Sequence, residues 1–216
     1  MYQLVIFDLD GTLLDTLEDL KNSVNYALGT QQLPPRTLDE VRRFVGNGIR
    51  NLCERAVPAG TPAEVTDAVF AAFNPHYAVH CADYTKPYAG ALAVMEQLRR
   101  DGAQLAVVSN KSDYAVQTLA AQYFPGLLDA AAGAKDGVRK KPYPDAVFAV
   151  MEQLHADRAG TVYIGDSEVD IETAKNAGLP CISVSWGFRS RQLLEQAGAS
   201  CICEDMQQMY RAIQAG

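Results

Sequence analysis

Basic residues are scarce in this chain of 216 residues. Lysine and arginine together number 19, against 26 aspartates and glutamates, which gives a formal net charge of −7 at pH 7. Proteins that bind nucleic acids usually present a basic stripe to the phosphate backbone. The charge balance therefore argues against a nucleic-acid partner, and we expect none.

Long apolar runs are also missing. No stretch reaches the roughly 18 consecutive apolar residues of a membrane span. No basic region precedes the short apolar stretch near the N-terminus, so that stretch predicts a strand and not a signal peptide. The five cysteines are scattered, and Cys201 and Cys203 form no CxxC pair. A zinc site or a disulfide framework is therefore disfavoured, and we expect a cytoplasmic protein with free thiols and no membrane partner.

One long segment shows only helical spacing of its apolar residues. It covers residues 15–84, with breaks at LPPRTLDE and at GNG (46–48). Within it, Thr37 and Glu40 have the spacing of a capping box, and Pro62 marks the expected start of a further helix. The segment therefore predicts an all-helical unit, entered through short connections that are candidate hinges.

Outside that segment, short apolar runs alternate with helical spacing. Strands are predicted at 2–7, 104–110, 127–134, 160–166 and 181–186, and helices near 88–98, 113–122, 147–154, 169–178 and 204–214. This alternation implies right-handed crossovers and a parallel sheet covered on both faces. We therefore expect an α/β fold with a doubly wound, Rossmann-like parallel sheet. Residues 1–14 and 85–216 would form this core, and residues 15–84 an inserted, all-helical cap domain.

Polar residues follow three of the predicted strands. In an open parallel sheet, ligands bind outside the carboxyl ends of the strands, so we expect these residues to converge. They are Asp8, Asp10, Gly11 and Thr12 after the first strand, Ser109 and Asn110 after the second, Asp166 and Asp170 after the strand at 160–166, and Lys140 and Lys141 in the loop before a helix. Acids, a hydroxyl and a lysine at one sheet edge indicate a reaction site.

These residue types suit phosphoryl transfer. Clustered carboxylates repel one another, and Mg²⁺, which takes oxygen ligands, is a natural counter-ion. A carboxylate beside a phosphoryl group can attack it to form an aspartyl phosphate, and a second acid can protonate the leaving oxygen. A hydroxyl, main-chain amides and a lysine can hold the remaining oxygens. Gly11 lets the main chain come close to them.

Each feature also has a plainer interpretation. The stretch from Asp8 to Gly11 has the composition of a simple turn, Lys140 and Lys141 that of a solvated pair, and Ser109 that of a helix cap. The three histidines fit no catalytic spacing, and Trp186 is expected to pack or to line the loop after the last strand.

Four stretches carry a resemblance to a known family. DLDGTLLDT, VSNK, KKPYP and GDSEVDIETAKNAG resemble, in order, the four motifs of the haloacid dehalogenase superfamily. The helical insertion resembles the cap of its first subclass. FVGNGIRNL, KDGVRKKPYPD and SVSWGFRSRQLLEQAGA are similar to segments of phosphoglycolate phosphatases.

The resemblance implies a role for each matching residue. Asp8 would be the nucleophile, and Asp10 the general acid and then the base. Mg²⁺ would be held by the carboxylates of Asp8 and Asp166 and the main-chain carbonyl of Asp10, with Asp170 orienting a water or a lysine. The phosphoryl group would be bound by Gly11, Thr12, Ser109, Asn110 and Lys141. Because Asp10 is present, the resemblance implies phosphoryl transfer and not dehalogenation.

The cap is expected to select the substrate through Asn47 and Arg50. GNG is equally consistent with a plain helix-breaking turn, and Arg50 with an exposed surface residue. Both alternatives stay open at this point.

The sequence thus predicts a Mg²⁺-dependent phosphatase that acts on a small phosphorylated metabolite, with 2-phosphoglycolate as the first candidate substrate. A sugar phosphomutase of the same superfamily would use the same core motifs. A receiver-like signalling switch would use similar acids and a lysine, but it needs no substrate-covering cap. The sequence leaves the oligomeric state undetermined.

Overall fold

The apolar run before Asp8 forms a strand, β1 (Leu4–Phe7), in the computed structural model, which describes residues 1–216. All four of its side chains are fully buried. It pairs in parallel with β4 (Gln104–Ser112) on one side and with β6 (Thr161–Gly165) on the other. Such continuous apolar character is typical of a strand that is covered on both faces of its sheet.

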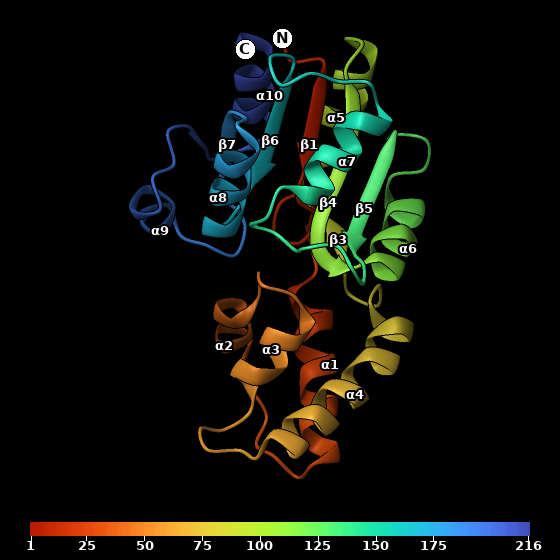
Figure 1. Cartoon of the computed structure of the whole chain (residues 1–216), viewed down its shortest axis with the longest axis vertical. Helices are drawn as coiled ribbons and strands as arrows, with labels where there is room; N and C mark the ends of the chain where they lie inside the picture. The colour runs from red at the N-terminus through yellow and green to blue at the C-terminus, as the bar shows by residue number, and fades with distance from the viewer. The chain divides into compact units, whose positions relative to one another are not determined.

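The sheet has six parallel strands in the order β5-β4-β1-β6-β7-β8. The remaining three are β5 (Ala130–Ala134), β7 (Cys181–Val184) and β8 (Ile202–Cys203). The order changes direction at β1, between β4 and β6, and crevices at such a switch point hold the ligands of doubly wound folds. The predicted fold class is confirmed (Figure 1).

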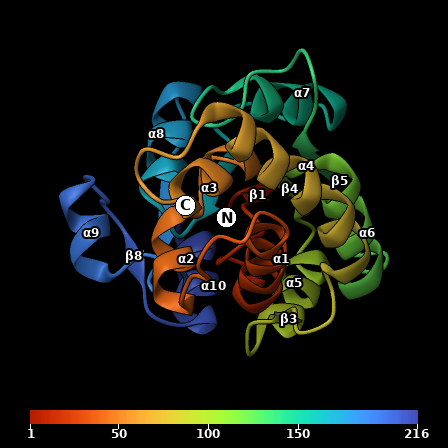
Figure 2. The same cartoon turned by 90° about the horizontal axis from the view of Figure 1, so that it is seen from below.

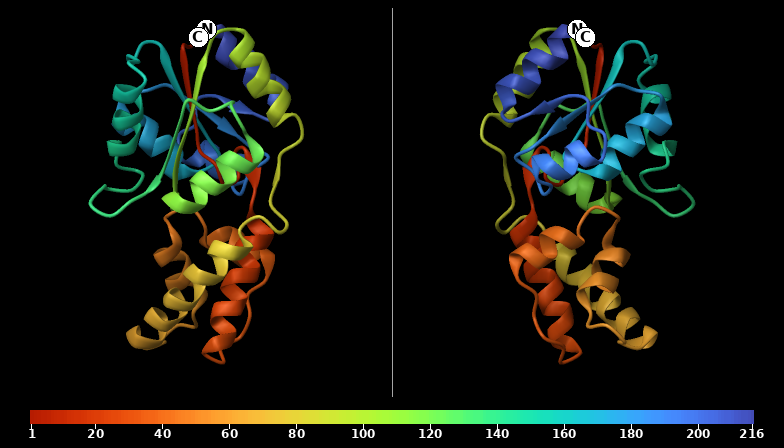
Figure 3. Two further views of the ribbon diagram at one scale, coloured as in Figure 1. Left: turned by 90° about the vertical axis from the view of Figure 1, so that its right-hand side faces the viewer. Right: turned by 90° about the vertical axis from the view of Figure 1, so that its left-hand side faces the viewer.

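Helices cover both faces of this sheet. Figures 2 and 3 show α7 (Asp145–Gln153) and α8 (Glu168–Ala177) on one face, with α5 (Ala91–Arg100) and α10 (Met206–Ala215) on the other. Apolar side chains of β1, β4 and β6 form a core with those of α7 and α8. Helix α6 (Asp113–Tyr123) packs on β4 and β5, and α9 (Arg191–Gln196) follows β7.

The chain divides into two compact units, which are Met1–Asp15 with Pro87–Gly216, and Thr16–Lys86. These boundaries lie within one or two residues of those expected from the sequence. The stretch expected to be wholly helical nevertheless begins with a strand residue, because β2 (Leu14–Asp15) pairs with β3 (Lys86–Pro87) in a separate two-stranded sheet.

The second unit consists of four helices, α1 (Leu17–Thr30), α2 (Leu38–Phe44), α3 (Ile49–Ala56) and α4 (Ala63–His80). The capping box of α2 is confirmed, since Thr37 Oγ1 accepts from Glu40 N at 3.3 Å and Glu40 Oε2 accepts from Thr37 N at 2.8 Å. The main-chain hydrogen bond from Thr37 is the chief reason that the pKa of Glu40 is lowered.

A buried carboxylate joins the beginning and the end of the segment that forms this unit. Asp19 of α1 is 1% exposed and accepts hydrogen bonds from Tyr84 N, Thr85 N and Thr85 Oγ1 at distances from 2.7 to 3.0 Å. The segment that follows α4 is thereby fixed to the first turn of α1. No helix of the chain is both long and apolar enough to cross a bilayer.

Candidate active site

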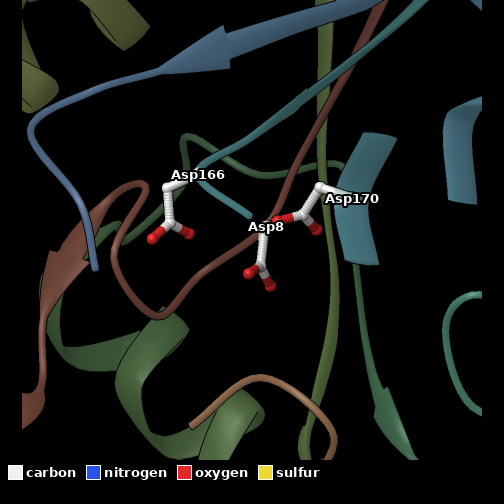
Figure 4. Close-up of side chains that lie close together, drawn as sticks. All are labelled: Asp8, Asp166 and Asp170. Atoms are coloured by element: carbon white, nitrogen blue, oxygen red, sulfur yellow. The ribbon is translucent and has the colours of Figure 1, made fainter. Parts of the chain in front are cut away.

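Three aspartates meet at the carboxyl end of the central strands. Asp8 follows β1, Asp166 follows β6, and Asp170 lies in the first turn of α8. Carboxylate oxygens from all three lie within 4.8 Å of one another, and all three residues are buried. Figure 4 shows the three carboxylates grouped at the end of these strands. The cluster lies at the edge where the change in strand order predicts a ligand site.

Asp8 is held in an unusual electrostatic environment. Lys141 Nζ lies 2.9 Å from Asp8 Oδ1, yet this buried oxygen takes part in no well-directed hydrogen bond. Desolvation, together with the charges of Asp170 and Asp10, raises the pKa of Asp8 to about 6 against the opposing effect of Lys141. Asp8 therefore has an oxygen that is paired in charge with Lys141 but accepts no well-directed hydrogen bond from the protein.

Asp170, in contrast, is fully engaged by protein groups. Its Oδ1 accepts from Lys141 Nζ at 2.7 Å and from Tyr163 OH at 3.3 Å, and its Oδ2 accepts from Ser167 Oγ at 2.6 Å and Ser167 N at 3.1 Å. A side chain at Gly165 would leave no room, since a Cβ there would lie 2.2 Å from Asp170 Cβ. Asp170 is thus placed to orient Lys141.

Asp166 is positioned by two loops. Its Oδ2 accepts from Phe188 N at 2.6 Å, and its Oδ1 accepts from Thr12 Oγ1 at 3.3 Å. The Thr12 hydroxyl thus donates to this carboxylate, and the expected role of Thr12 in binding the phosphoryl group stays a prediction. Gly11 has φ +84°, and a Cβ there would lie 2.4 Å from Asp166 Oδ2, so both the turn and the close approach require glycine.

A third interaction joins the same two loops, because Trp186 Nε1 donates to the Thr12 carbonyl at 3.1 Å. Trp186 therefore lines the loop after β7, one of the two places expected for it. The main-chain donor at Phe188 was not found from the sequence, because a backbone N–H leaves no trace in residue identity. Burial raises the pKa of Asp166 well above its usual value, and so do the charges of Asp170 and Asp8.

Lys141 connects two of the acids. Its side chain is 3% exposed and lies between Asp8 and Asp170, whereas Lys140 is exposed. Burial by itself favours the neutral amine, but the carboxylates of Asp170 and Asp8 outweigh it and raise the pKa of Lys141 well above its usual value. The ammonium form is therefore retained in the buried site.

Asn110 fixes the main chain of Lys141. Its Nδ2 donates to the Lys141 carbonyl at 3.0 Å, and its Oδ1 accepts from Lys141 N at 2.8 Å. This pair of bonds positions Lys141, and a direct contact of Asn110 with the phosphoryl group stays a prediction. Ser109 is buried at the end of β4, and its Oγ accepts from Lys111 N at 3.4 Å.

One side chain of the site, Lys111, lies in the VSNK motif but received no role from the sequence. Its Nζ lies 2.8 Å from Asp10 Oδ1 and 3.1 Å from Asp10 Oδ2. Its position directly after Ser109 and Asn110, at the end of a strand beside β1, was the available signal.

A match to a protein-family model decides to which family the chain belongs. Residues 5–184 match the model described as haloacid dehalogenase-like hydrolase, and this range spans the three aspartates and both buried lysines. The chain belongs to that family. The resemblance noted in the sequence is therefore confirmed.

Curated and solved members of the haloacid dehalogenase-like family agree with this assignment. The chain is 36% identical over 202 residues to the phosphoglycolate phosphatase of Caulobacter vibrioides, covering 92% of this chain and 85% of that one. It is 32% identical over 214 residues to the phosphoglycolate phosphatase of Pseudomonas putida, covering 94% and 77%. A crystal structure from Lactobacillus delbrueckii subsp. bulgaricus, of a protein provisionally assigned as a phosphoglycolate phosphatase, superposes with a TM-score of 0.94 at 37% identity and covers 98% of both chains.

The acidic cluster of this family member has the chemistry of a divalent-cation site. Three buried carboxylates lie together, and Lys141 is the cation that pairs with two of them, Asp8 and Asp170. Asp8 Oδ1 is paired in charge with Lys141 but accepts no well-directed hydrogen bond, and a buried acceptor in this state fits an oxygen that binds an ion. Asp8 and Asp166 fit as ligands better than Asp170, whose two oxygens already accept four contacts from the protein.

The two candidate specificity residues lie in the helical unit and have partners there. Arg50 pairs with Glu54 at 2.7 Å and with Asp67 at 2.5 Å, and its guanidinium lies over the ring of Phe70. Asn47 Oδ1 accepts from Arg55 at 2.7 Å. These contacts support the helical unit itself, and a role of either residue in substrate selection stays a prediction.

Proposed function

We propose that this chain is a Mg²⁺-dependent phosphatase that hydrolyses a small phosphomonoester through an aspartyl phosphate at Asp8. The observation that carries the proposal is the state of Asp8, which is buried, holds an unsatisfied oxygen, and faces the ammonium of Lys141. A second acid, Asp10, stands two residues along the same loop. A nucleophile, an acid and a fixed cation at one strand end are the parts that phosphoryl transfer needs.

In the first step, an oxygen of Asp8 attacks phosphorus while the bond from phosphorus to the leaving oxygen breaks. Asp10 gives a proton to that leaving oxygen, so the alcohol departs neutral. Lys141 and the Ser109 hydroxyl hold the non-bridging oxygens of the phosphoryl group. Gly11 has no side chain, which would clash with Asp166, and the main chain of this loop can therefore come close to the phosphoryl group.

In the second step, a water attacks phosphorus and Asp10 takes up its proton. The bond from phosphorus to Asp8 breaks, which frees inorganic phosphate and restores the carboxylate. Mg²⁺ would be held by the carboxylates of Asp8 and Asp166 and the carbonyl of Asp10, and would supply positive charge against the crowded acids and the phosphoryl oxygens. Asp170 keeps Lys141 in place throughout.

The first substrate to test is 2-phosphoglycolate. Two relatives that share about a third of their residues with this chain are named phosphoglycolate phosphatases, and the chain covers 77% or more of each. Phosphate release from a panel of phosphorylated metabolites, measured with Mg²⁺ and with excess EDTA, tests both substrate and metal. We expect 2-phosphoglycolate to give the highest kcat/KM, and EDTA to abolish release. Release that is unaffected by EDTA would contradict the metal dependence.

A further inference from the structure

A second buried lysine makes an ion pair that the proposed reaction has not used. Lys111 is the last residue but one of β4, and its Nζ lies 2.8 and 3.1 Å from the two carboxylate oxygens of Asp10. The Lys111 side chain is 1% exposed and that of Asp10 is 13% exposed. The two residues are 101 positions apart in sequence, and adjacent strands, β4 and β1, bring them together.

Burial of the Lys111 ammonium costs free energy. An ammonium withdrawn from water is tolerated only when a counter-charge and hydrogen bonds replace the lost hydration. Asp10 supplies a counter-charge and two acceptor oxygens, which both lie within hydrogen-bond distance of the Lys111 nitrogen. Rotation of the Asp10 carboxylate away from its position would break both of these contacts, so the pair restrains that carboxylate.

Lys111 is separate from the lysine that faces the nucleophile. Lys141 pairs with Asp8 and Asp170, and Lys111 pairs with Asp10. The site therefore assigns one buried ammonium to the proposed nucleophile and another to the proposed acid.

We propose that Lys111 is a positioning residue, which holds the Asp10 carboxyl where it can pass a proton to the leaving oxygen and later accept one from water. This inference rests on the proposed phosphatase function. Lys111 does not itself touch the phosphoryl group in this account, and its effect on the rate passes through Asp10.

The leaving group provides the first test. Single-turnover formation of phosphoenzyme is measured for Lys111→Met with p-nitrophenyl phosphate and with the alkyl phosphate that the unmodified enzyme hydrolyses fastest. A positioned acid is typically worth about 10²–10⁴-fold. We expect the alkyl ester to lose at least about tenfold of its rate, and the aryl ester, whose leaving group needs little protonation, to lose less than about threefold.

A double-variant comparison distinguishes positioning from general support of the fold. Asp10→Asn is compared with Asp10→Asn/Lys111→Met, in which neither charge of the pair remains. If Lys111 acts through Asp10, removing it from the Asp10→Asn enzyme costs no further rate with the alkyl ester. This comparison also holds if Lys111→Met alone fails to fold, since the double variant removes both charges of the pair together.

The control is Lys135→Met, which removes an exposed lysine paired with Asp113 at 3.4 Å. It should match the unmodified enzyme with both esters. Two results would overturn the inference about Lys111 while Asp10→Asn still slows the alkyl ester. In the first, Lys111→Met slows both esters by the same factor. In the second, adding Lys111→Met to Asp10→Asn lowers the rate by the same factor as Lys111→Met does in the unmodified enzyme. If Asp10→Asn forms phosphoenzyme from the alkyl ester at the unmodified rate, the proposed role of Asp10 is wrong and the inference fails with it.

Discussion

Lys141 Nζ lies 2.7 Å from Asp170 Oδ1 and 2.9 Å from Asp8 Oδ1, so one buried ammonium joins an acid that the protein satisfies to one that it does not. The satisfied acid is fixed by Ser167 and Tyr163. In this arrangement Asp170 sets the position of Lys141, and Lys141 faces the carboxylate proposed to react.

Substitution of Asp170 tests that relationship. Asp170→Asn keeps the size of the side chain but removes the charge that holds Lys141, and loss of such a supporting partner typically costs about 10–100-fold in activity. We expect kcat to fall within that range while the protein remains folded by circular dichroism. Glu172→Gln, an exposed position on the same helix, is the matched control and should leave kcat unchanged. A normal kcat in Asp170→Asn would show that Lys141 needs no such anchor.

The raised pKa of Asp8 predicts a pH-dependent difference in stability. The pKa of Asp8 rises from 3.8 to about 6 on folding, so the folded state favours the protonated form. In Mg²⁺-free buffer, the unmodified protein should therefore lose stability relative to Asp8→Asn as the pH rises from about 4 to about 6, and the difference should then stay constant. Thermal unfolding of the two proteins at matched pH measures it. A difference that shrinks as the pH rises would contradict the direction of the pKa shift.

Asp19 should stabilise the helical unit. Asp19→Ala removes the acceptor of two buried donors of Thr85 and of a part-buried donor of Tyr84, and an unsatisfied buried donor typically costs about 1–3 kcal/mol. Urea unfolding should show a loss of that size. Asp39→Ala, which removes an exposed carboxylate paired with Arg42, is the control and should have almost no effect. Equal losses in both variants would mean that the buried hydrogen bonds of Asp19 contribute no more to the free energy of unfolding than an exposed ion pair does.

Asn47 and Arg50 remain the candidates for substrate selection. If they contact substrate, Asn47→Ala and Arg50→Ala should change the order of preference among alkyl phosphoesters and leave p-nitrophenyl phosphate comparatively unaffected. Arg50 also bridges Glu54 and Asp67, so a purely structural role predicts equal losses with every substrate. Ratios of kcat/KM across the panel separate the two outcomes.

The parts of this site that depend on residue type and spacing could be predicted from the sequence. Buried apolar runs that end in Asp8, Ser109 and Asp166 follow from strand patterning, and the parallel sheet brings their ends together. The capping box of α2 was likewise visible, because both of its partners are side chains at fixed spacing.

Other features depend on contacts that only the folded chain creates. The hydrogen bond from Phe188 N to Asp166 uses a main-chain donor, and the Asn110 side chain binds the main chain of Lys141 across 31 positions. Strand β8 and helix α9 were not expected because each is short, and β8 has only two residues. The helix expected from residue 88 begins at Ala91, after Gly90 with φ +83°, and the last helix begins after Asp205, whose side chain accepts from Gln208 N.

The central claim is that a phosphoryl group passes through Asp8, and rapid quenching of the reaction tests it most directly. The unmodified enzyme is mixed with its best alkyl phosphate and Mg²⁺, quenched in acid within milliseconds, and digested for mass spectrometry. The account predicts a phosphorylated peptide containing Asp8 that decays in well under about a second, the time set by ordinary enzyme turnover, and that is absent from Asp8→Asn. Phosphate release without any such peptide, or substantial release by folded Asp8→Asn, would contradict it.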